Sequence, residues 1–160
     1  MRAEQAMLEF QDPHIDHAPK HIPLLRVEIL GQEFLALLDT GSTGSLVGSD
    51  IQALISKSKS KITTDLRAIS MAVGNCQAAE SCILSVKWCS GTRRQRFIIV
   101  PNLNRSIILG LDFLKATHIN VNVAEGGWTQ GLGEQRLIPF DHVASMKTLH
   151  STPAVSGTGN

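Results

Sequence analysis

The apolar residues of this chain come in short segments in which every second side chain is apolar, and this period limits the folds open to it. Residues 25–30 alternate in this way, Gly31-Gln32 offers a tight turn, and residues 34–38 are all apolar. Successive side chains of a β-strand point to opposite faces, so the period predicts strands and the turn predicts a hairpin.

Further segments continue the pattern. Residues 69–73 and 82–88 alternate on either side of a turn region at 74–81, which predicts a second, longer hairpin. The apolar runs at 97–100 and 107–109 are typical of buried strands, residues 111–117 favour two turns of helix, and residues 119–123 alternate as a final strand. Many short strands with one short helix predict a mainly antiparallel β domain.

The length of 160 residues fits one domain with extensions at both ends. Three prolines between residues 13 and 23 interrupt any helix there, so we expect residues 1–21 to form a flexible linker. Residues 22–125 then form the domain.

Residues 126–160 are expected to form a C-terminal extension that is partly packed and then disordered. Its last ten residues, 151–160, are rich in Ser, Thr and Gly, a composition that favours disorder. Trp128 and residues 137–140 are apolar and leave two alternatives, packing back onto the domain or serving as a linker.

Composition excludes several classes of protein. Fifteen basic and fourteen acidic residues give a net charge of +1, too small a field to select nucleic acid or a membrane surface. The apolar runs are far shorter than the roughly 20 residues of a membrane-spanning helix. Three cysteines match neither a zinc site nor a disulfide framework, which favours a reducing, cytoplasmic setting. Aromatic residues make up only 4%, so we expect an aliphatic core.

The candidate site is the turn that follows the apolar run of residues 34–38. Asp39 ends that run and Thr40, Gly41 and Ser42 follow it. Gly41 lets the backbone turn, so that its amide can approach the carboxylate, while the two hydroxyls can hold the loop and Asp39 in one arrangement. A buried carboxylate at a strand end is costly unless it is satisfied in this way, which indicates a functional role.

The segment from Leu37 to Ser42 resembles the active-site motif of the aspartic proteases. Ile107-Ile108-Leu109-Gly110 resembles their second segment of two hydrophobic residues and glycine, which precedes a helix. The likeness is greatest to the retropepsins, the proteases of retroviruses and LTR retrotransposons, and especially to the retrotransposon type. It covers about residues 23–125 and implies a closed antiparallel β domain with one short C-terminal helix.

The resemblance implies an enzyme made of two chains. Pepsin-like enzymes hold two such motifs in one chain, whereas this chain has one Asp-Thr-Gly and no evident internal repeat. We therefore expect a C2 homodimer in which each subunit gives one Asp39. Two carboxylates this close cannot both ionise cheaply, and the aspartic-protease dyad is the standard example of such a pair. The two Asp39 side chains would share one proton and activate a water molecule. Activity should be bell-shaped or acid-favoured in pH.

Further roles follow from the same resemblance. Thr40 would bind its counterpart across the twofold axis, Gly41 would accept a hydrogen bond from the substrate backbone, and residues 119–123 would supply a strand of the dimer interface. A flap from about Met71 to Leu84 would close over an extended peptide. Ile107 and Leu109 would pack under the site or line subsites. The residues assigned to substrate binding are Ser42, Met71, Val73, Gly74, Asn75, Cys76, Gln77, Ile107 and Leu109.

The chain also departs from the retroviral pattern. Thr43-Gly44 stands where the viral enzymes often carry an acidic residue, and Leu111 stands where they often have arginine. Both groups tie the viral dimers together, so their loss affects the expected dimer strength. Asp112 is expected to cap or solvate the start of the helix at residues 111–117.

We expect an aspartic endopeptidase of an LTR retroelement that cuts the element's polyprotein next to apolar residues, in the cytoplasm or inside retroelement particles. It needs no metal or other cofactor. The alternative is a domesticated retropepsin-like domain that serves as a non-catalytic dimerisation or binding module. The loop also resembles the phosphate-binding turn of the actin and Hsp70 ATPases, but those folds need far longer chains and further phosphate loops.

Overall fold

The computed structural model describes residues 22–65 and 79–143. Its elements, in chain order, are β1 (Leu24–Ile29), β2 (Gln32–Leu38), β3 (Leu46–Val47), α2 (Ser49–Lys57), β4 (Ile62–Asp65), β5 (Ala79–Trp88), β6 (Gly91–Ile99), β7 (Ile107–Leu109), α3 (Leu111–Thr117), β8 (Ile119–Asn122), β9 (Gly127–Gln130) and β10 (Ile138–Pro139). The domain is mainly β, as the sequence predicted.

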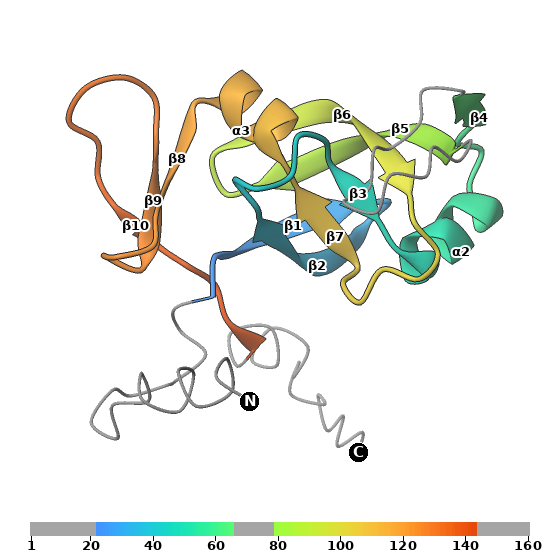
Figure 1. The fold of residues 1–160 in the computed structure, drawn as a ribbon, viewed down its shortest axis with the longest axis horizontal. Coiled ribbons are helices and arrows are strands. Elements are labelled where there is room, and N and C mark those ends of the chain that lie inside the picture. The colour runs from blue at the N-terminus through green and yellow to red at the C-terminus, as the bar shows by residue number, and fades with distance from the viewer. Residues whose placement is uncertain (1–21, 66–78, 144–160) are drawn as a thin grey trace, which may run out of the picture.

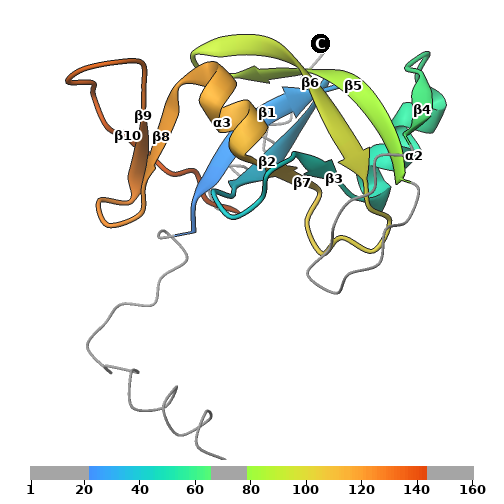
Figure 2. The same ribbon diagram turned by 45° about the horizontal axis from the view of Figure 1, so that its top comes forward.

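Seven strands form one sheet in the order β1-β2-β7-β3-β6-β5-β4, and a pairing between β1 and β5 closes it into a barrel with β4 outside the ring. Figures 1 and 2 show this barrel with α3 against one end and α2 near the other. Most pairs are antiparallel, but β2 runs parallel to β7 and β3 runs parallel to β6. The parallel pairing of β2 with β7 brings the ends of these two strands together.

The first hairpin shows how local sequence sets the register. The pairing of β1 with β2 extends to Ile29 and Gln32, which leaves Leu30 and Gly31 as a two-residue loop. Both residues have positive φ, 52° and 76°, as this tight type of hairpin turn requires. The turn therefore lies one residue before the Gly31-Gln32 position that we expected from the sequence.

The barrel interior is filled by the inward side chains of the alternating strands. On β5, Cys82, Leu84 and Val86 are buried while the residues between them are exposed. The core is not purely aliphatic, because Phe97, Phe113 and Trp128 are its largest fully buried side chains. The expectation of an aliphatic core was therefore wrong in part: few aromatic residues are present, but most of these are inside.

The chain after α3 packs back against the barrel. Strands β8, β9 and β10 form a separate three-stranded sheet to one side of it (Figure 1). Trp128 on β9 is completely buried, and Phe140 beyond β10 is 5% exposed. The Asp141 carboxylate accepts a 2.7 Å hydrogen bond from the backbone amide of Arg26 on β1. Of the two alternatives for Trp128 and residues 137–140, the structure shows packing onto the domain.

Several elements differ from those predicted. Helix α2 was not expected, β5 begins at Ala79 inside the predicted turn at 74–81, and β6 begins at Gly91 instead of residue 97. The predicted strand at 69–73 and most of its turn lie outside the described residues. Among the residues that the structure describes, no helix has the length and apolar character needed to cross a membrane.

Candidate active site

Asp39 stands where β2 ends beside β7. Leu37 and Leu38 pair in parallel with Ile108 and Leu109, and the Asp39 amide donates to the Leu109 carbonyl at 2.9 Å. Asp39 as a residue is partly buried, and its Oδ1 accepts a 2.8 Å hydrogen bond from the Gly41 amide at the exposed side of the loop. This contact fixes the orientation of the acid with the backbone alone, as the glycine in the motif indicated.

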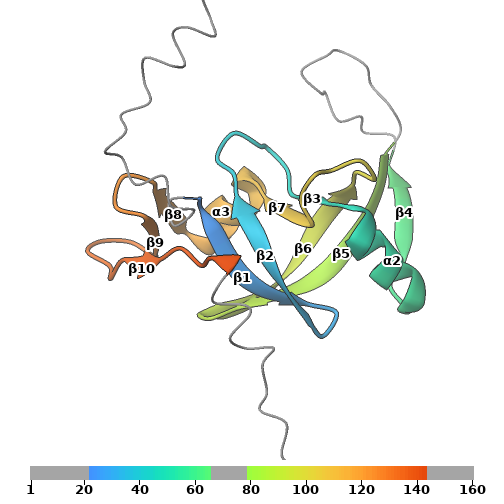
Figure 3. The same ribbon diagram turned by 90° about the horizontal axis from the view of Figure 1, so that it is seen from below.

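The residues after Asp39 form a loop, residues 39–45, that is bonded to the start of α3. The Leu111 amide donates to the Ser42 carbonyl at 2.8 Å, and the Asp112 amide donates to the Thr43 carbonyl at 3.3 Å. Within the loop, the Ser42 hydroxyl donates to the Gly44 carbonyl at 2.7 Å. Figure 3 shows the loop leaving β2 and passing α3 before β3 begins. We call this segment the Asp39 loop.

Gly110 makes the close approach of loop and helix possible. A Cβ atom at this position would lie 2.4 Å from the Gly44 carbonyl oxygen and 2.6 Å from the Ser42 carbonyl oxygen. Both atoms belong to the backbone, so no side chain could move aside to make room. The second sequence motif therefore needs glycine because the backbone of the Asp39 loop lies too close for a Cβ atom. The φ of Gly110, −91°, is open to any residue and does not itself require glycine.

A polar cluster that the sequence did not indicate holds the far end of the loop. The buried Ser45 hydroxyl donates to Oδ1 of Asp112 at 2.7 Å and accepts from the Gly110 amide at 3.1 Å. Gln95, which is 3% exposed on β6, donates to Oδ2 of Asp112 at 2.7 Å. The expectation that Asp112 serves only the helix start was incomplete.

A second cluster repeats this arrangement at the other end of the antiparallel strand pair β3–β7. Gly48 precedes α2 as Gly110 precedes α3, and the two glycines have similar backbone angles. Asp50 accepts from the hydroxyl of Ser106, the residue before β7, just as Asp112 accepts from Ser45, the residue before β3. The sequence showed no internal repeat, but the structure has this local one.

The predicted site residues have different positions. Asp39, Thr40, Gly41 and Ser42 lie together in the loop, and Thr40 is exposed. Ile107 and Leu109 are completely buried in the single chain, which agrees with the first of the two roles expected for them, packing under the site or lining subsites. The remaining residues assigned to substrate binding lie outside the described residues: Met71, Val73, Gly74, Asn75, Cys76 and Gln77.

The strand predicted for the dimer interface has one edge already paired. Strand β8 forms an antiparallel pair with β9 of the same chain, from Ile119 opposite Gln130 to Asn122 opposite Gly127. The β8 strand ends the order β10-β9-β8, so its other edge has no strand beside it in the described part of the chain.

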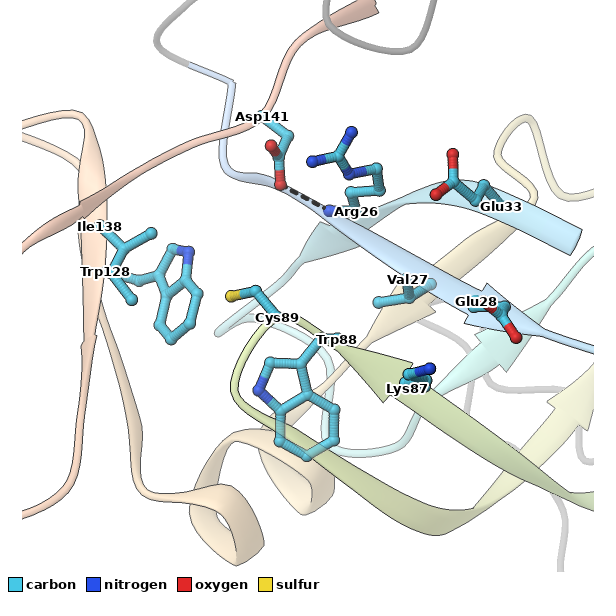
Figure 4. Close-up of a pocket in the computed structure, with 10 residues that line it drawn as sticks. All are labelled: Arg26, Val27, Glu28, Glu33, Lys87, Trp88, Cys89, Trp128, Ile138 and Asp141. Atoms are coloured by element: carbon cyan, nitrogen blue, oxygen red, sulfur yellow. Dashed lines mark hydrogen bonds between the residues drawn. The ribbon is translucent and has the colours of Figure 1, made fainter. Parts of the chain in front are cut away.

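A separate hollow of about 500 Å³ lies between β1 and the C-terminal sheet. Figure 4 shows Trp88, Trp128 and Ile138 among its lining residues, together with charged side chains such as Lys87. No lining residue belongs to the Asp39 loop. Among residues 22–65 and 79–143 there is also no group of three His, Cys, Asp or Glu side chains placed to hold a metal ion.

The chemistry open to a single chain is therefore that of one oriented carboxylic acid. Oδ1 of Asp39 is bonded to the Gly41 amide, whereas its second oxygen has no hydrogen bond to the described residues. A second acid within reach would complete an acid–base pair for hydrolysis.

Comparison with known proteins agrees with this geometry. The family model for retroviral aspartyl protease matches residues 19–122. The fold is similar to the retroviral protease-like domain of Ddi1 from Leishmania major, with a TM-score of 0.52 and 18% identity over 74% of this chain and 94% of that one. It is also similar to EIAV protease solved with an inhibitor, with a TM-score of 0.50 and 20% identity over 68% of this chain and 99% of that one.

The search of curated protein sequences gave no match. The two structural likenesses are below 25% identity and support the fold alone. The family match, however, covers more than half of the chain and includes both the Asp39 loop and the β7–α3 junction. The chain therefore belongs to the retroviral aspartyl protease family.

Proposed function

We propose that this chain is an aspartic endopeptidase that works as a C2 homodimer. The observation that carries the proposal is the Asp39 carboxylate, held at the end of β2 by the Gly41 amide in a loop seated on the β7–α3 junction. One such acid per chain fits a site on a twofold axis, to which each subunit contributes one Asp39.

The two carboxylates would divide the work of hydrolysis between them. Two acids this close cannot both ionise cheaply, so they hold one proton between them. The ionised Asp39 removes a proton from a bound water molecule, which attacks the peptide carbonyl carbon, while the protonated Asp39 gives its proton to the carbonyl oxygen. The tetrahedral diol then collapses with proton transfer to the leaving nitrogen, and no bond forms between enzyme and substrate.

The substrate that we propose is an extended peptide in the polyprotein of an LTR retroelement, cut between apolar residues, in the cytoplasm or within the element's particles. The support is the resemblance of the Asp-Thr-Gly-Ser loop to retropepsins of the retrotransposon type. An extended segment can be bound as an added strand, so that backbone hydrogen bonds supply affinity and side-chain pockets supply selectivity.

The test is cleavage of an apolar peptide library by the wild type and by Asp39→Asn. The asparagine keeps an oxygen that can accept from the Gly41 amide, so the loop should persist while the acid is lost. We expect the variant to lose at least about 1,000-fold in kcat, since both carboxylates of the dyad are then replaced by amides. A pepstatin-type inhibitor should block the wild type. Equal turnover by the two proteins would exclude the mechanism.

The rival is a domesticated domain that dimerises or binds peptide without cutting it. The likeness to a domain described only as retroviral protease-like favours keeping this alternative. A wild type that dimerises and binds apolar peptides, but leaves the whole library intact from pH 4 to pH 7, would establish the binding module and reject the peptidase.

A further inference from the structure

We propose that Asp112 is a positioning residue of this active site, which holds the Asp39 loop on helix α3 and thereby fixes where Asp39 stands. The inference rests on the proposed function for its effect on turnover. Its structural part, the hold on the loop, can be measured separately.

The Asp112 carboxylate collects hydrogen bonds from three different elements. Oδ1 accepts from the Ser45 hydroxyl at 2.7 Å and from the Phe113 amide at 2.8 Å. Oδ2 accepts from the Gln95 side chain at 2.7 Å and from the Ser45 amide at 3.3 Å. Although Asp112 is exposed on one side, Ser45 and Gln95 are buried at 1% and 3% exposure, so the carboxylate satisfies donors that water does not reach.

This cluster fixes one end of the Asp39 loop, while the strand pairing fixes the other. At the start, the Asp39 amide is bonded to Leu109. At the end, Ser45 is bonded to Asp112 through both its hydroxyl and its amide. The backbone of residue 112 also donates to the Thr43 carbonyl between them. A loop held at both ends and in its middle has little freedom, and a catalytic acid on it is preorganised.

The cluster also joins the loop to the β5–β6 hairpin. Gln95 lies in the middle of β6, opposite Leu84 on β5, and its amide nitrogen donates both to Asp112 and to the Arg96 carbonyl. A hydrogen bond to a charged acceptor is stronger than one between neutral groups. The Asp112 carboxylate therefore ties the Asp39 loop to β6 through side chains, beside the backbone bond from the Ile98 amide to the Ser45 carbonyl at 3.0 Å.

The chain contains a matched control in Asp50. It also stands two residues after a glycine at a helix start, accepts from the next backbone amide at 2.9 Å, and accepts from a serine hydroxyl next to a strand. Its serine partner is Ser106, and none of its hydrogen-bond partners belongs to the Asp39 loop. A general loss of stability should follow from either variant, whereas a loss of positioning should follow only from the change at Asp112.

The experiment compares Asp112→Asn with Asp50→Asn in the full chain. The NH₂ group of the asparagine faces either the Gln95 side-chain nitrogen and the Ser45 amide or the Phe113 amide. All of these are N–H donors, so the hold on the loop is weakened at nearly constant volume. We expect kcat for a cleaved peptide to fall by about 10- to 100-fold with KM within about twofold, because small displacements of catalytic groups are costly. At least one limb of the pH profile should also move, since the dyad spacing sets its shared titration. Asp50→Asn should keep kcat within about twofold and leave the profile in place.

Amide hydrogen exchange gives a readout that does not depend on catalysis. The Leu111 amide, which donates to Ser42 in the loop, should exchange at least about 10-fold faster in Asp112→Asn, measured against the amides of the β1–β2 hairpin. Asp50→Asn should leave this ratio unchanged. Ser45→Ala, which removes a single hydroxyl, should reproduce both effects in weaker form and serves in place of Asp112→Asn if that variant does not fold.

The outcomes separate the two proposals. A wild type without peptidase activity would reject the proposed function, while the exchange ratio would still decide whether Asp112 holds the loop. Wild-type exchange in Asp112→Asn, or equal losses of kcat in Asp112→Asn and Asp50→Asn, would overturn the positioning role.

Discussion

Replacing Gly110 by alanine tests whether the Asp39 loop must lie in direct backbone contact with the start of helix α3. The added Cβ would lie 2.4 Å from the Gly44 carbonyl oxygen and 2.6 Å from the Ser42 carbonyl oxygen. Carbon and oxygen pack comfortably near 3.5 Å, so loop and helix must separate by about 1 Å. Since both contacts are with backbone, a side-chain rotation cannot relieve the clash.

The cost follows from the hydrogen bonds that this separation breaks. The amides of residues 110, 111 and 112 donate to Ser45, Ser42 and Thr43 at 3.1, 2.8 and 3.3 Å. A shift of about 1 Å takes all three beyond hydrogen-bond range, and at roughly 1 kcal/mol each the loss is about 3 kcal/mol. The strain of overpacking adds about 1–3 kcal/mol, so we expect a loss of about 4–6 kcal/mol in the free energy of unfolding.

Urea unfolding followed by tryptophan fluorescence measures this loss, because Trp88 and Trp128 are both buried. Protein concentration is held constant, since a dimer gains stability by mass action. Gly44→Ala is the control: its Cβ would meet only the Ile98 side chain, at 3.9 Å, so we expect a change within about 1 kcal/mol. A Gly110→Ala protein as stable as Gly44→Ala would refute the reasoning.

Three further changes probe the core. Burial raises the pKa of the Cys82 thiol from 9.0 to about 11, so iodoacetamide at pH 8 should label the exposed Cys89 and leave Cys82 intact until the protein unfolds, as mass spectrometry can show. The folded state holds this proton more tightly than the unfolded state, so the stability it contributes is complete below pH 9 and falls as the pH rises toward 11. The unfolding free energy of the wild type should therefore fall relative to that of Cys82→Ala by up to about 1.4 kcal/mol per pH unit in that window, and parallel curves would contradict this. The Trp128 indole N–H is buried without a partner among the described residues, so Trp128→Phe, which removes this unsatisfied donor, should cost no more than about 2 kcal/mol in chemical unfolding despite the lost volume. Phe97→Ala, which leaves a cavity at a fully buried position, should cost about 3–5 kcal/mol, and a smaller loss than that of Trp128→Phe would show that the core is placed wrongly.

The elements with a clear local apolar pattern could be predicted from the sequence. The hairpin at residues 24–38, the buried strand at 107–109 and the helix at 111–117 all form close to where their patterns placed them. Each has an apolar pattern that matches its own burial, so local pattern and tertiary structure agree. The Asp-Thr-Gly-Ser turn was readable for the same reason: its glycine and hydroxyls act within the loop itself.

The remaining elements depend on contacts that a local pattern does not contain. The first half of β6 carries the exposed residues Thr92, Arg93 and Arg94, and this polar run concealed the strand. The structure shows that β6 pairs with β5 from Gly91 to Ile98. Helix α2 buries only Ile51 and Ile55 among its nine residues, too narrow a stripe to stand out in a Ser- and Lys-rich segment. Its hydrophobic face becomes evident only when the barrel is present.

The polar cluster around Asp112 could not be predicted either. Ser45 and Asp112 are 67 positions apart, and only the β3–β7 pairing brings them together. One signal was available: a serine before the strand and an aspartate two residues after the glycine occur at both Gly48 and Gly110. This repeat shows that the two segments are alike, but the hydrogen bonds cross between them, from Ser45 to Asp112 and from Ser106 to Asp50, and only the folded structure shows this.

The central claim is that two chains share one active site, and mixing the wild type with Asp39→Asn tests it most directly. Wild-type concentration is kept constant while an equal amount of the variant is added and the subunits are allowed to exchange. Random pairing then leaves about half of the wild-type chains with a wild-type partner, so peptidase activity should fall to about half. Activity that stays constant as the variant is added would show that each chain cuts alone, and would contradict the shared site.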